Sequence, residues 1–550
     1  MENQTAKSLK SKAVALLDSG KLQQALKKAQ LGMKRFPGDS DYQAIAGFVL
    51  TEMKQYKRSI PHFVEAARMK PNDPQFAENL ANALMQTGQI DRALTYAEQK
   101  ADQFPANKEL ARVIHEIKSK GNNWRSIIEY LTDKLSTDPN NTDYLARRSR
   151  AYGHIGFFDA SVRDIARAYD LAPNKTHIAF RKAVNLHFSG DKAGSIKILC
   201  EVLETEPDHT AALFQMSSLV SREAAPDLLE RVNAVISARD YVSSSLKFAR
   251  ADLISKIEGL DKAMALYTDA NATQHEKNPY NFSDEEAKYT STINNFPVDQ
   301  AAAGADIVNN PVPVFVIGQP RSGTTLMEMM LSSAPNIAGC GELTLGADLA
   351  IDYWKNATPF DKSAAHVFAE SFRKMMPPIP EGSIAFVDKM PHNYQRVGFL
   401  LAAFPNAKVI NMLRDPRDVG LSKWIRRFPA NGMNYASNLK SIAHSANLYR
   451  RYMAHWDAVY GDQILTVSYE DLVADPKTYS QQVAAFCDLE WQESMMHPEK
   501  NTKEVRTASI DQVRKKISTK SIGGWRNVAE HIQPMLDGFD PDLWPEYTFD

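Results

Sequence analysis

The sequence has few cysteines and no ligand spacing typical of a metal site. Only three cysteines occur in 550 residues, at Cys200, Cys340 and Cys487. Without a Cys-x-x-Cys spacing, the sequence argues against a disulfide framework and against a cysteine-based zinc site. The 13 histidines show no His-Glu-x-x-His or comparable spacing, so we expect no metal.

The chain also lacks net charge and long apolar runs. Its formal net charge is −1, so global electrostatics give no reason to expect nucleic acid or a membrane surface as a partner. The N-terminal MENQTAKSLK has no signal-peptide core, and the apolar run VGFLLAAF (397–404) is too short to span a bilayer. We expect a soluble, cytoplasmic protein, and its length predicts two or more domains.

What the first part of the chain does contain is a fixed interval of 34 residues. Prolines recur at Pro37, Pro71, Pro105, Pro139, Pro173 and Pro207. Proline fills roughly one position in twenty of an average chain, so this spacing is not chance. The same step separates Gly20, Gly88, Gly156 and Gly190, with Lys54 and Asn122 at the two missing positions. Small residues follow five positions later at Ala25, Ser59, Ala93, Ser161 and Ser195, with Ile127 as the exception.

This stretch resembles a tetratricopeptide repeat (TPR) array, whose period is 34 residues. The glycine turns the chain between two helices, the small residue lets them pack closely, and proline follows the second helix. We predict an all-α solenoid over residues 1–270, with six repeats at about 6–209 and a drifted repeat or cap at 246–270. A generic helical bundle would have no reason to keep this interval. Such arrays commonly hold a protein or peptide on their concave surface.

A connector is predicted at 271–311, with a short helix that Ser283 and Glu286 would open as a capping box. From 312 to 550, strand-like runs alternate with amphipathic helical ones. These runs are VFVIG (314–318), IAFVDK (384–389), AKVINMLR (407–414) and QILTVSYEDL (463–472). They predict an α/β domain with a mostly parallel sheet, helices on both faces, and ligands at the carboxyl ends of its strands.

The first candidate anion site is the loop in VFVIGQPRSGTTLMEMM (314–330). The order strand, loop and helix start is typical of phosphate binding, because a helix N-terminus offers backbone N–H groups. The spacing from Gly318 to Gly323 fits the P-loop, which has lysine next, but Thr324 stands there. The loop is therefore P-loop-like, and Arg321 would neutralise a shorter anion without a metal. Its candidate ligands are Arg321, Ser322, Gly323, Thr324 and Thr325.

A second candidate anion site lies in VINMLRDPRDVGLSKWIRR (409–427). Arg414 ends a predicted strand, Ser422 opens the following helix, and Arg426 comes one turn later. Two guanidinium groups and a hydroxyl at a strand-to-helix crossing would bind phosphate. Lys389 ends a third strand. Two phosphate sites in one domain suggest a nucleotide that is phosphorylated at two places.

At this point the chain resembles the sulfotransferases. PRSGTTL followed by RDPRDVGLS is similar to their motifs for the 5′-phosphosulfate and 3′-phosphate of PAPS, 3′-phosphoadenylyl sulfate. The tyrosylprotein sulfotransferases are most similar, through PRSGTTLMEMMLSSAPNIAGCGE, VSYEDLV (467–473) and RTASIDQVRKK (506–516). The resemblance covers about 312–530. The resemblance implies PAPS as co-substrate, PAP as product and no metal. It also explains why the loop has no lysine, since a bound phosphosulfate has no γ-phosphate or magnesium for a lysine to contact.

The resemblance also implies roles for individual residues. Glu342 would be the general base that takes the proton of the acceptor hydroxyl. Arg321, Lys389 and Ser509 would stabilise charge on the sulfuryl group and on the leaving phosphate oxygen.

The remaining implied roles concern the nucleotide. Arg414, Ser422 and Arg426 would bind the 3′-phosphate, while Tyr469 and the segment 509–518 would close over the nucleotide. Arg417, between two aspartates, is expected to form a structural ion pair.

Some features depart from the family pattern and leave alternatives open. Where the family has Ser-Lys-Trp, this chain has Gly523-Gly524-Trp525, and Lys520 or Arg526 would compensate for the missing lysine at Gly524. The acceptor could be a tyrosine-containing peptide, a glycan or a small molecule. The basic runs KWIRRF and VRKK could guide an acidic peptide or serve the nucleotide. The alternative interpretations are a TPR scaffold with an inactive sulfotransferase-like domain and a nucleotide kinase. A homodimer is compatible with the sequence.

Overall fold

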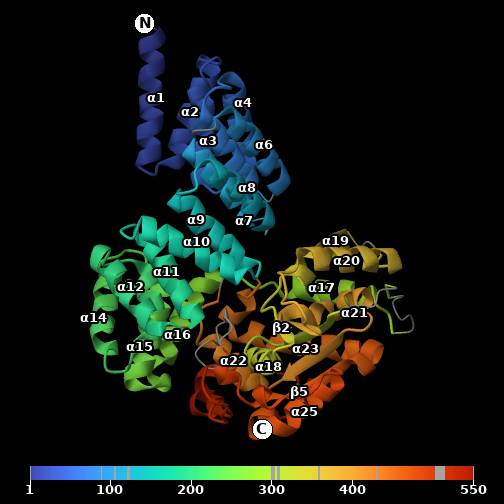
Figure 1. Cartoon of the computed structure of the whole chain (residues 1–550). Helices are drawn as coiled ribbons and strands as arrows, with labels where there is room; N and C mark the ends of the chain where they lie inside the picture. The colour runs from blue at the N-terminus through green and yellow to red at the C-terminus, as the bar shows by residue number, and fades with distance from the viewer. Residues whose placement is uncertain are drawn as a thin grey trace. The chain divides into compact units, whose positions relative to one another are not determined.

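The computed structural model describes residues 2–87, 89–104, 107–120, 124–298, 304–305, 310–356, 359–428, 432–501 and 514–548. The chain divides into two compact units, Met1–Pro139 and Asn140–Asp550. Each has hydrophobic core clusters of its own. Figure 1 draws the first in blue and the second from teal to red. Among the described helices, none has the length and hydropathy needed to cross a bilayer.

The first unit consists of paired helices that follow the 34-residue interval. They are α1 (Glu2–Asp18), α2 (Leu22–Arg35), α3 (Ser40–Glu52), α4 (Tyr56–Met69), α5 (Pro74–Gln86), α6 (Ile90–Gln103), α7 (Lys108–Lys120) and α8 (Trp124–Thr137). The small residues Ala25, Ser59 and Ala93 are fully buried, as close packing of each pair requires. The turn position is left-handed both at Gly20 (φ 71°) and at Lys54 (φ 57°). The helical repeat architecture predicted from the interval is thus confirmed.

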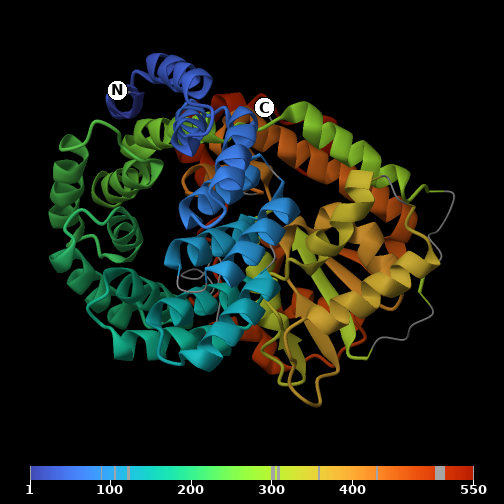
Figure 2. The same ribbon diagram turned by 90° about the horizontal axis from the view of Figure 1, so that it is seen from above.

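The second unit begins with further helix pairs. They are α9 (Thr142–His154), α10 (Phe158–Leu171), α11 (Thr176–Ser189), α12 (Lys192–Thr205), α13 (Thr210–Leu219), α14 (Ala225–Ser237), α15 (Ser244–Glu258) and α16 (Leu260–Lys277). Gly156 and Gly190 make left-handed turns, at φ 81° and 94°. From α9 to α16 the helices, teal to green, follow a curved path (Figure 2).

Helix α17 (Phe282–Asn294) lies in the predicted connector. Its capping differs from the prediction, because Asn281 is the N-cap and its side chain accepts hydrogen bonds from the N–H groups of Ser283 and Asp284. Ser283 is therefore already helical and does not open a capping box with Glu286. The asparagine satisfies the first free N–H groups two residues earlier.

The last repeat helices share a core with the sheet of the second unit. Phe248 and Tyr267 belong to the same buried cluster as Phe315 and Trp456. In addition, the Asn271 side chain on α16 donates a hydrogen bond of 2.9 Å to the carbonyl of Trp424. The repeats in this unit are thus fixed to the domain that follows them.

The sheet is parallel, in the order β2-β3-β1-β4-β5. Its strands are β1 (Val312–Gly318), β2 (Ile337–Gly339), β3 (Ala385–Asp388), β4 (Lys408–Leu413) and β5 (Ile464–Ser468). The mostly parallel sheet is confirmed, but β2 was not predicted. The run predicted at 463–472 ends at Ser468, because this serine caps α24 (Tyr469–Ala474) by accepting from the N–H of Asp471.

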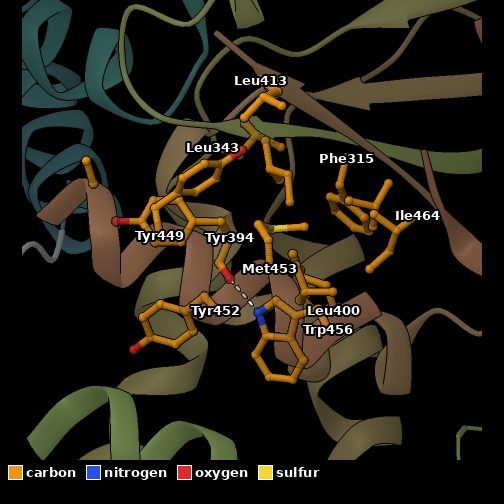
Figure 3. Packing of buried hydrophobic residues seen from close by; sticks show 14 of the residues in the cluster. Phe315, Leu343, Tyr394, Leu400, Leu413, Tyr449, Tyr452, Met453, Trp456 and Ile464 are labelled. Carbon is orange, nitrogen blue, oxygen red and sulfur yellow. Dashed lines mark hydrogen bonds between the residues drawn. The ribbon is translucent and has the colours of Figure 1, made fainter. Parts of the chain in front are cut away.

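Both faces of the sheet are buried. Along β1, Val314 and Val316 face one cluster, whereas Phe315 and Ile317 face the other. Helices α18 (Thr324–Leu331) and α25 (Pro476–Phe486) pack on the first face, and α20 (Lys362–Met375), α21 (Val397–Ala403) and α23 (Leu439–Tyr460) on the second. In the second cluster the Trp456 indole donates to the carbonyl of Tyr394 at 2.7 Å (Figure 3). The carboxyl ends of all five strands therefore meet at one edge.

Candidate active site

The loop between β1 and α18 has a conformation that only certain residues adopt. Gly323 is the N-cap of α18 with φ 102°, and a Cβ there would lie 2.5 Å from Cδ2 of Tyr469. Arg321 is left-handed too, at φ 80°, although it carries a side chain, and such strain concentrates at functional sites. The Ser322 side chain is buried, and its hydroxyl has no hydrogen-bond partner among the described residues. A buried polar atom of this kind is expected to meet a ligand or water.

Three arginines gather at this loop. Arg321 donates through Nε to the Ser422 hydroxyl at 2.9 Å, and Arg414 donates to the carbonyl of Arg321 at 3.1 Å. Burial, together with the charges of Arg426 and Arg414, lowers the pKa of Arg321 to about 9. Bringing these cations together is unfavourable by itself. The arrangement is therefore suited to a bound anion, which would relieve the repulsion.

A cavity of about 220 Å³ opens beside this loop, and five of the nine predicted donor-site residues line it, namely Arg321, Gly323, Thr325, Arg414 and Tyr469. The other four, Ser322, Thr324, Ser422 and Arg426, are not among its lining residues. Tyr469 is held from two sides, because its hydroxyl is 2.8 Å from that of Ser521 and the Arg414 guanidinium lies 4.4 Å from its ring centre. We call this cavity the donor cavity.

The C-terminal segment also lines the donor cavity, through Lys515, Lys516, Ile517, Ser518, Lys520 and Ser521. Two of these residues, Lys515 and Lys516, belong to the VRKK run. Of the two residues proposed to replace the family lysine, Lys520 lies on this cavity. Ser509, with the rest of 502–513, lies outside the described residues.

Helix α22 (Pro416–Trp424) organises the second predicted anion site. Its Asp418 side chain accepts hydrogen bonds from the N–H groups of Gly523 (2.6 Å) and Trp525 (3.1 Å). Arg417 pairs with Asp415 at 2.9 Å, the ion pair that the sequence indicated, and lies 4.3 Å from the Trp525 ring centre. These contacts fix the chain after Ser521 against α22.

Two of the predicted 3′-phosphate ligands, Ser422 and Arg426, lie in different environments. Ser422 does not open a helix as predicted, because α22 begins at Pro416 after the N-cap Asp415, and Ser422 lies in its last turn. Its hydroxyl accepts a hydrogen bond from Arg321 in the loop, which brings the two predicted anion sites together. Arg426 is exposed, and its charge acts both on Arg321 and on the half-buried Asp252 of α15.

The predicted base and lysine are in contact. Lys389, which follows β3, is fully buried, and its Nζ lies 2.6 Å from Oε1 of Glu342, which follows β2. Glu328 on α18 supports this pair, because its Oε2 lies 3.9 Å from Nζ and its Oε1 accepts from the N–H of Gly341 at 2.7 Å. The Glu342 side chain keeps 38% of its surface exposed. Sequence reasoning missed Glu328, which lies inside an otherwise apolar helical pattern.

The exposed side of Glu342 faces a second cavity, of about 530 Å³. The sheet domain contributes Glu328, Gly341, Glu342, Thr344 and Met390 to its lining. The remaining lining residues belong to α9–α11 and the turn at Gly156. The sequence did not predict that repeat helices would reach Glu342. We call this cavity the Glu342 cavity.

Comparison with known proteins identifies both parts of the chain. Residues 313–493 match the sulfotransferase family profile, and residues 50–114 match the tetratricopeptide repeat profile. An uncharacterized protein of Aquifex aeolicus is 25% identical over 89% of this chain and 72% of its own length. A putative protein-tyrosine sulfotransferase of Caenorhabditis briggsae is 28% identical over 42% of this chain and 86% of its own.

Among solved structures, the sulfotransferase domain of the Synechococcus PCC 7002 olefin synthase is 19% identical over 44% of this chain and 99% of that domain, with a TM-score of 0.32. The profile and sequence matches confirm the resemblances found in the sequence. The chain combines tetratricopeptide repeats with a domain of the sulfotransferase family.

Proposed function

We propose that this protein transfers the sulfuryl group of PAPS to the hydroxyl of a tyrosine in a peptide. The observation that carries the proposal is the position of α18 between the two cavities. Thr325 and Leu326 line the donor cavity, and Glu328 lines the Glu342 cavity. These residues lie within one helical turn, about 5 Å of rise. A donor on one side and an acceptor on the other would therefore meet beside Glu342.

In this proposal the loop holds the 5′-phosphosulfate and the second site holds the 3′-phosphate. The N–H groups at the start of α18, the Ser322 hydroxyl and Arg321 would bind the first anion. Arg414, Ser422 and Arg426 would bind the second, and Tyr469 would lie along the nucleotide. The lowered pKa of Arg321 supports this assignment, since an anion would favour its charged form.

PAPS supplies an activated sulfuryl group, and the protein has mainly to position it and stabilise charge. Glu342 would take the hydroxyl proton as the new S–O bond forms and the S–O bond to the 5′-phosphate breaks. A tyrosine hydroxyl has a pKa near 10, so such a base is needed at neutral pH. Arg321 would neutralise the charge that appears on the leaving phosphate oxygen, and Ser509 is proposed to assist.

Lys389 receives an additional role from the geometry. Its ammonium is fully buried and bound to the Glu342 carboxylate, so it would hold the base in place. Its proposed contact with the sulfuryl group requires that the ammonium also reach the donor when the donor is bound.

A thermal-shift titration tests the donor site, because stabilisation follows the ratio of ligand concentration to dissociation constant. We expect selective stabilisation by 3′,5′-ADP over 5′-ADP and over ATP with magnesium. Arg414→Ala should weaken this effect, whereas Arg250→Ala, at an exposed position of α15, should not. Transfer from radiolabelled PAPS to a tyrosine peptide, a sugar and a free phenol then tests the acceptor. A preference for ATP with magnesium would support the kinase reading instead, and 3′,5′-ADP binding without any transfer would support an inactive scaffold.

A further inference from the structure

The wall of the Glu342 cavity opposite the sheet domain is made by repeat helices. Helix α9 contributes Arg150 and His154, and α11 contributes Phe180, Arg181 and Phe188. These residues belong to the same compact unit as Glu342. The part of the array that reaches the site is therefore a fixed component of the cavity.

Close contacts at the turn after α9 hold this wall against the loop that carries Glu342. A Cβ on Gly156 would lie 3.4 Å from a methyl group of Leu343 and 3.6 Å from the carbonyl oxygen of Cys340. On the other side, a Cβ on Gly341 would lie 3.5 Å from the ring of Phe158. The repeat turn and the loop that carries Glu342 therefore lie close together, since a methyl group on either glycine would be in van der Waals contact with the opposite side.

Further contacts extend the attachment along α11. Phe188 packs against Met329 of α18, and its carbonyl lies 3.5 Å from a guanidinium nitrogen of Arg514. Arg514 directly precedes Lys515 and Lys516 on the donor cavity. The helix that lines the Glu342 cavity is therefore in contact with elements of both cavities.

The Glu342 cavity also continues beyond the base. Thr344 and Met390 line it and also line a third cavity of about 230 Å³, whose other lining residues include His392, Tyr394 and Tyr435. Two cavities that share lining residues on one side of Glu342 provide room for an extended chain rather than for a single small molecule.

The lining chemistry indicates what kind of chain. Phe158, Phe180 and Phe188 provide aromatic surface, which favours an aromatic side chain in the cavity. Arg150 and Arg181 add two guanidinium groups to the repeat wall, and guanidinium pairs well with carboxylate. A tyrosine with a neighbouring acidic residue would match both features.

We infer that helices α9 and α11 of the repeats form part of the acceptor site and that Arg150 and Arg181 determine acceptor specificity by binding a carboxylate next to the reacting tyrosine. This inference rests on the proposed function, since it assigns the Glu342 cavity to the acceptor. The array then acts within the active site itself, in addition to any partner that it holds elsewhere.

The test measures binding separately from transfer. The full chain is saturated with 3′,5′-ADP, and its affinity is measured by fluorescence anisotropy for two labelled peptides with one tyrosine each, flanked by glutamates or by serines. We expect the glutamate peptide to bind more tightly. Arg150→Glu and Arg181→Glu should each weaken it by about tenfold, because like charges then face each other. Thermal stabilisation by 3′,5′-ADP should stay unchanged, which shows that the variants are folded.

The chain offers matched controls on the same repeats. Arg163 is exposed on α10, and Lys182 follows Arg181 on α11, and neither lines the Glu342 cavity. Arg163→Glu and Lys182→Glu should bind the glutamate peptide like the wild type. Equal affinity in all four variants, or no binding of either peptide by the wild type, would overturn the inference.

Transfer from PAPS distinguishes this failure from failure of the proposed function. If the glutamate peptide binds through Arg150 and Arg181 but no sulfuryl group is transferred to any acceptor, the two arginines bind a carboxylate, but the proposed function fails and with it their role in acceptor specificity. If Arg150→Glu and Arg181→Glu sulfate the tyrosine of both peptides at the wild-type rate, the proposed function stands and the inference is overturned.

Discussion

Replacing Glu342 by glutamine should stop sulfuryl transfer while leaving the fold and the donor cavity intact. The Lys389 ammonium lies 2.6 Å from Oε1 of Glu342 and 3.9 Å from Oε2 of Glu328. A glutamine carbonyl oxygen can still accept from Lys389, so the buried ammonium keeps its hydrogen bond. What is lost is the proton acceptor, and a general base typically contributes about 10²- to 10⁴-fold. We therefore expect kcat to fall by about that factor in Glu342→Gln.

Glu342→Ala separates the catalytic role from the structural one. Alanine removes the acceptor as well as the base, so among the described residues the fully buried Lys389 keeps only the more distant carboxylate of Glu328. Leaving a buried donor without its partner costs roughly 1–3 kcal/mol, and the free energy of unfolding should fall by about this amount. Glutamine should keep nearly the wild-type value.

The assay combines initial rates of transfer from radiolabelled PAPS, urea unfolding and titration with 3′,5′-ADP. Glu381→Gln, at an exposed position before β3, is the matched control and should behave like the wild type in all three. Wild-type kcat in Glu342→Gln would refute the assignment of the base. Loss of 3′,5′-ADP binding together with activity would mean that the residue serves the fold or the donor instead.

Three further predictions concern other positions. Gly323→Ala should lower the affinity for 3′,5′-ADP at least about tenfold. The left-handed backbone costs an alanine roughly 1–2 kcal/mol, and the alanine Cβ would meet the Tyr469 ring. Wild-type affinity in a titration would contradict this prediction. Burial lowers the pKa of Lys423 to about 7, so between about pH 7 and 10 the unfolded chain binds a proton that the folded chain has released, and the free energy of unfolding should rise with pH. Lys423→Met should reduce this rise in urea unfolding at a series of pH values, and an unchanged slope would exclude Lys423 as its source. Lys54→Gly should stabilise the first unit by about 1 kcal/mol, because φ at this position is 57° and a left-handed backbone favours glycine. Lys57→Gly, within α4, should destabilise the unit by a similar amount. Equal unfolding curves for the two variants would contradict this prediction.

The sequence predicted best what depends on local constraints. The turn positions of the repeats must be left-handed, and the small residues must be buried. Glycines and small residues therefore recur in the sequence at intervals of 34 residues. Ser161 and Ser195 are fully buried in the second unit, like their counterparts in the first. The loop at Arg321 was predictable for the same reason, because its shape requires glycine at fixed positions. The strand β2 was not, since three residues carry too little pattern.

The candidate site was predictable only in its separate parts. Arg321, Lys389 and Arg414 were found because they follow predicted strands, and parallel strands end at one edge. Ser422 and Arg426 were found by their spacing from Arg414, and Glu342 and Tyr469 only through the family resemblance. Arg150 and Arg181 carry no such signal, because periodicity indicates a helix but not which later domain the helix meets. Their contact with the cavity depends on the packing of α16 on α22 and of Phe188 on Met329, which is a property of the tertiary structure.

The shared core of repeats and sheet has a consequence for how this protein can evolve. Repeat arrays ordinarily lengthen or shorten by whole units, because each repeat contacts only its neighbours. Before Pro139, gain or loss of a repeat would leave the Asn140–Asp550 unit complete. Between Asn140 and α16, inserting one would shift α9 and α11 away from Glu342 while α16 stays anchored at Trp424. We therefore expect related chains to vary in repeat number at the N-terminal side, and to change acceptors by point substitution in α9 and α11.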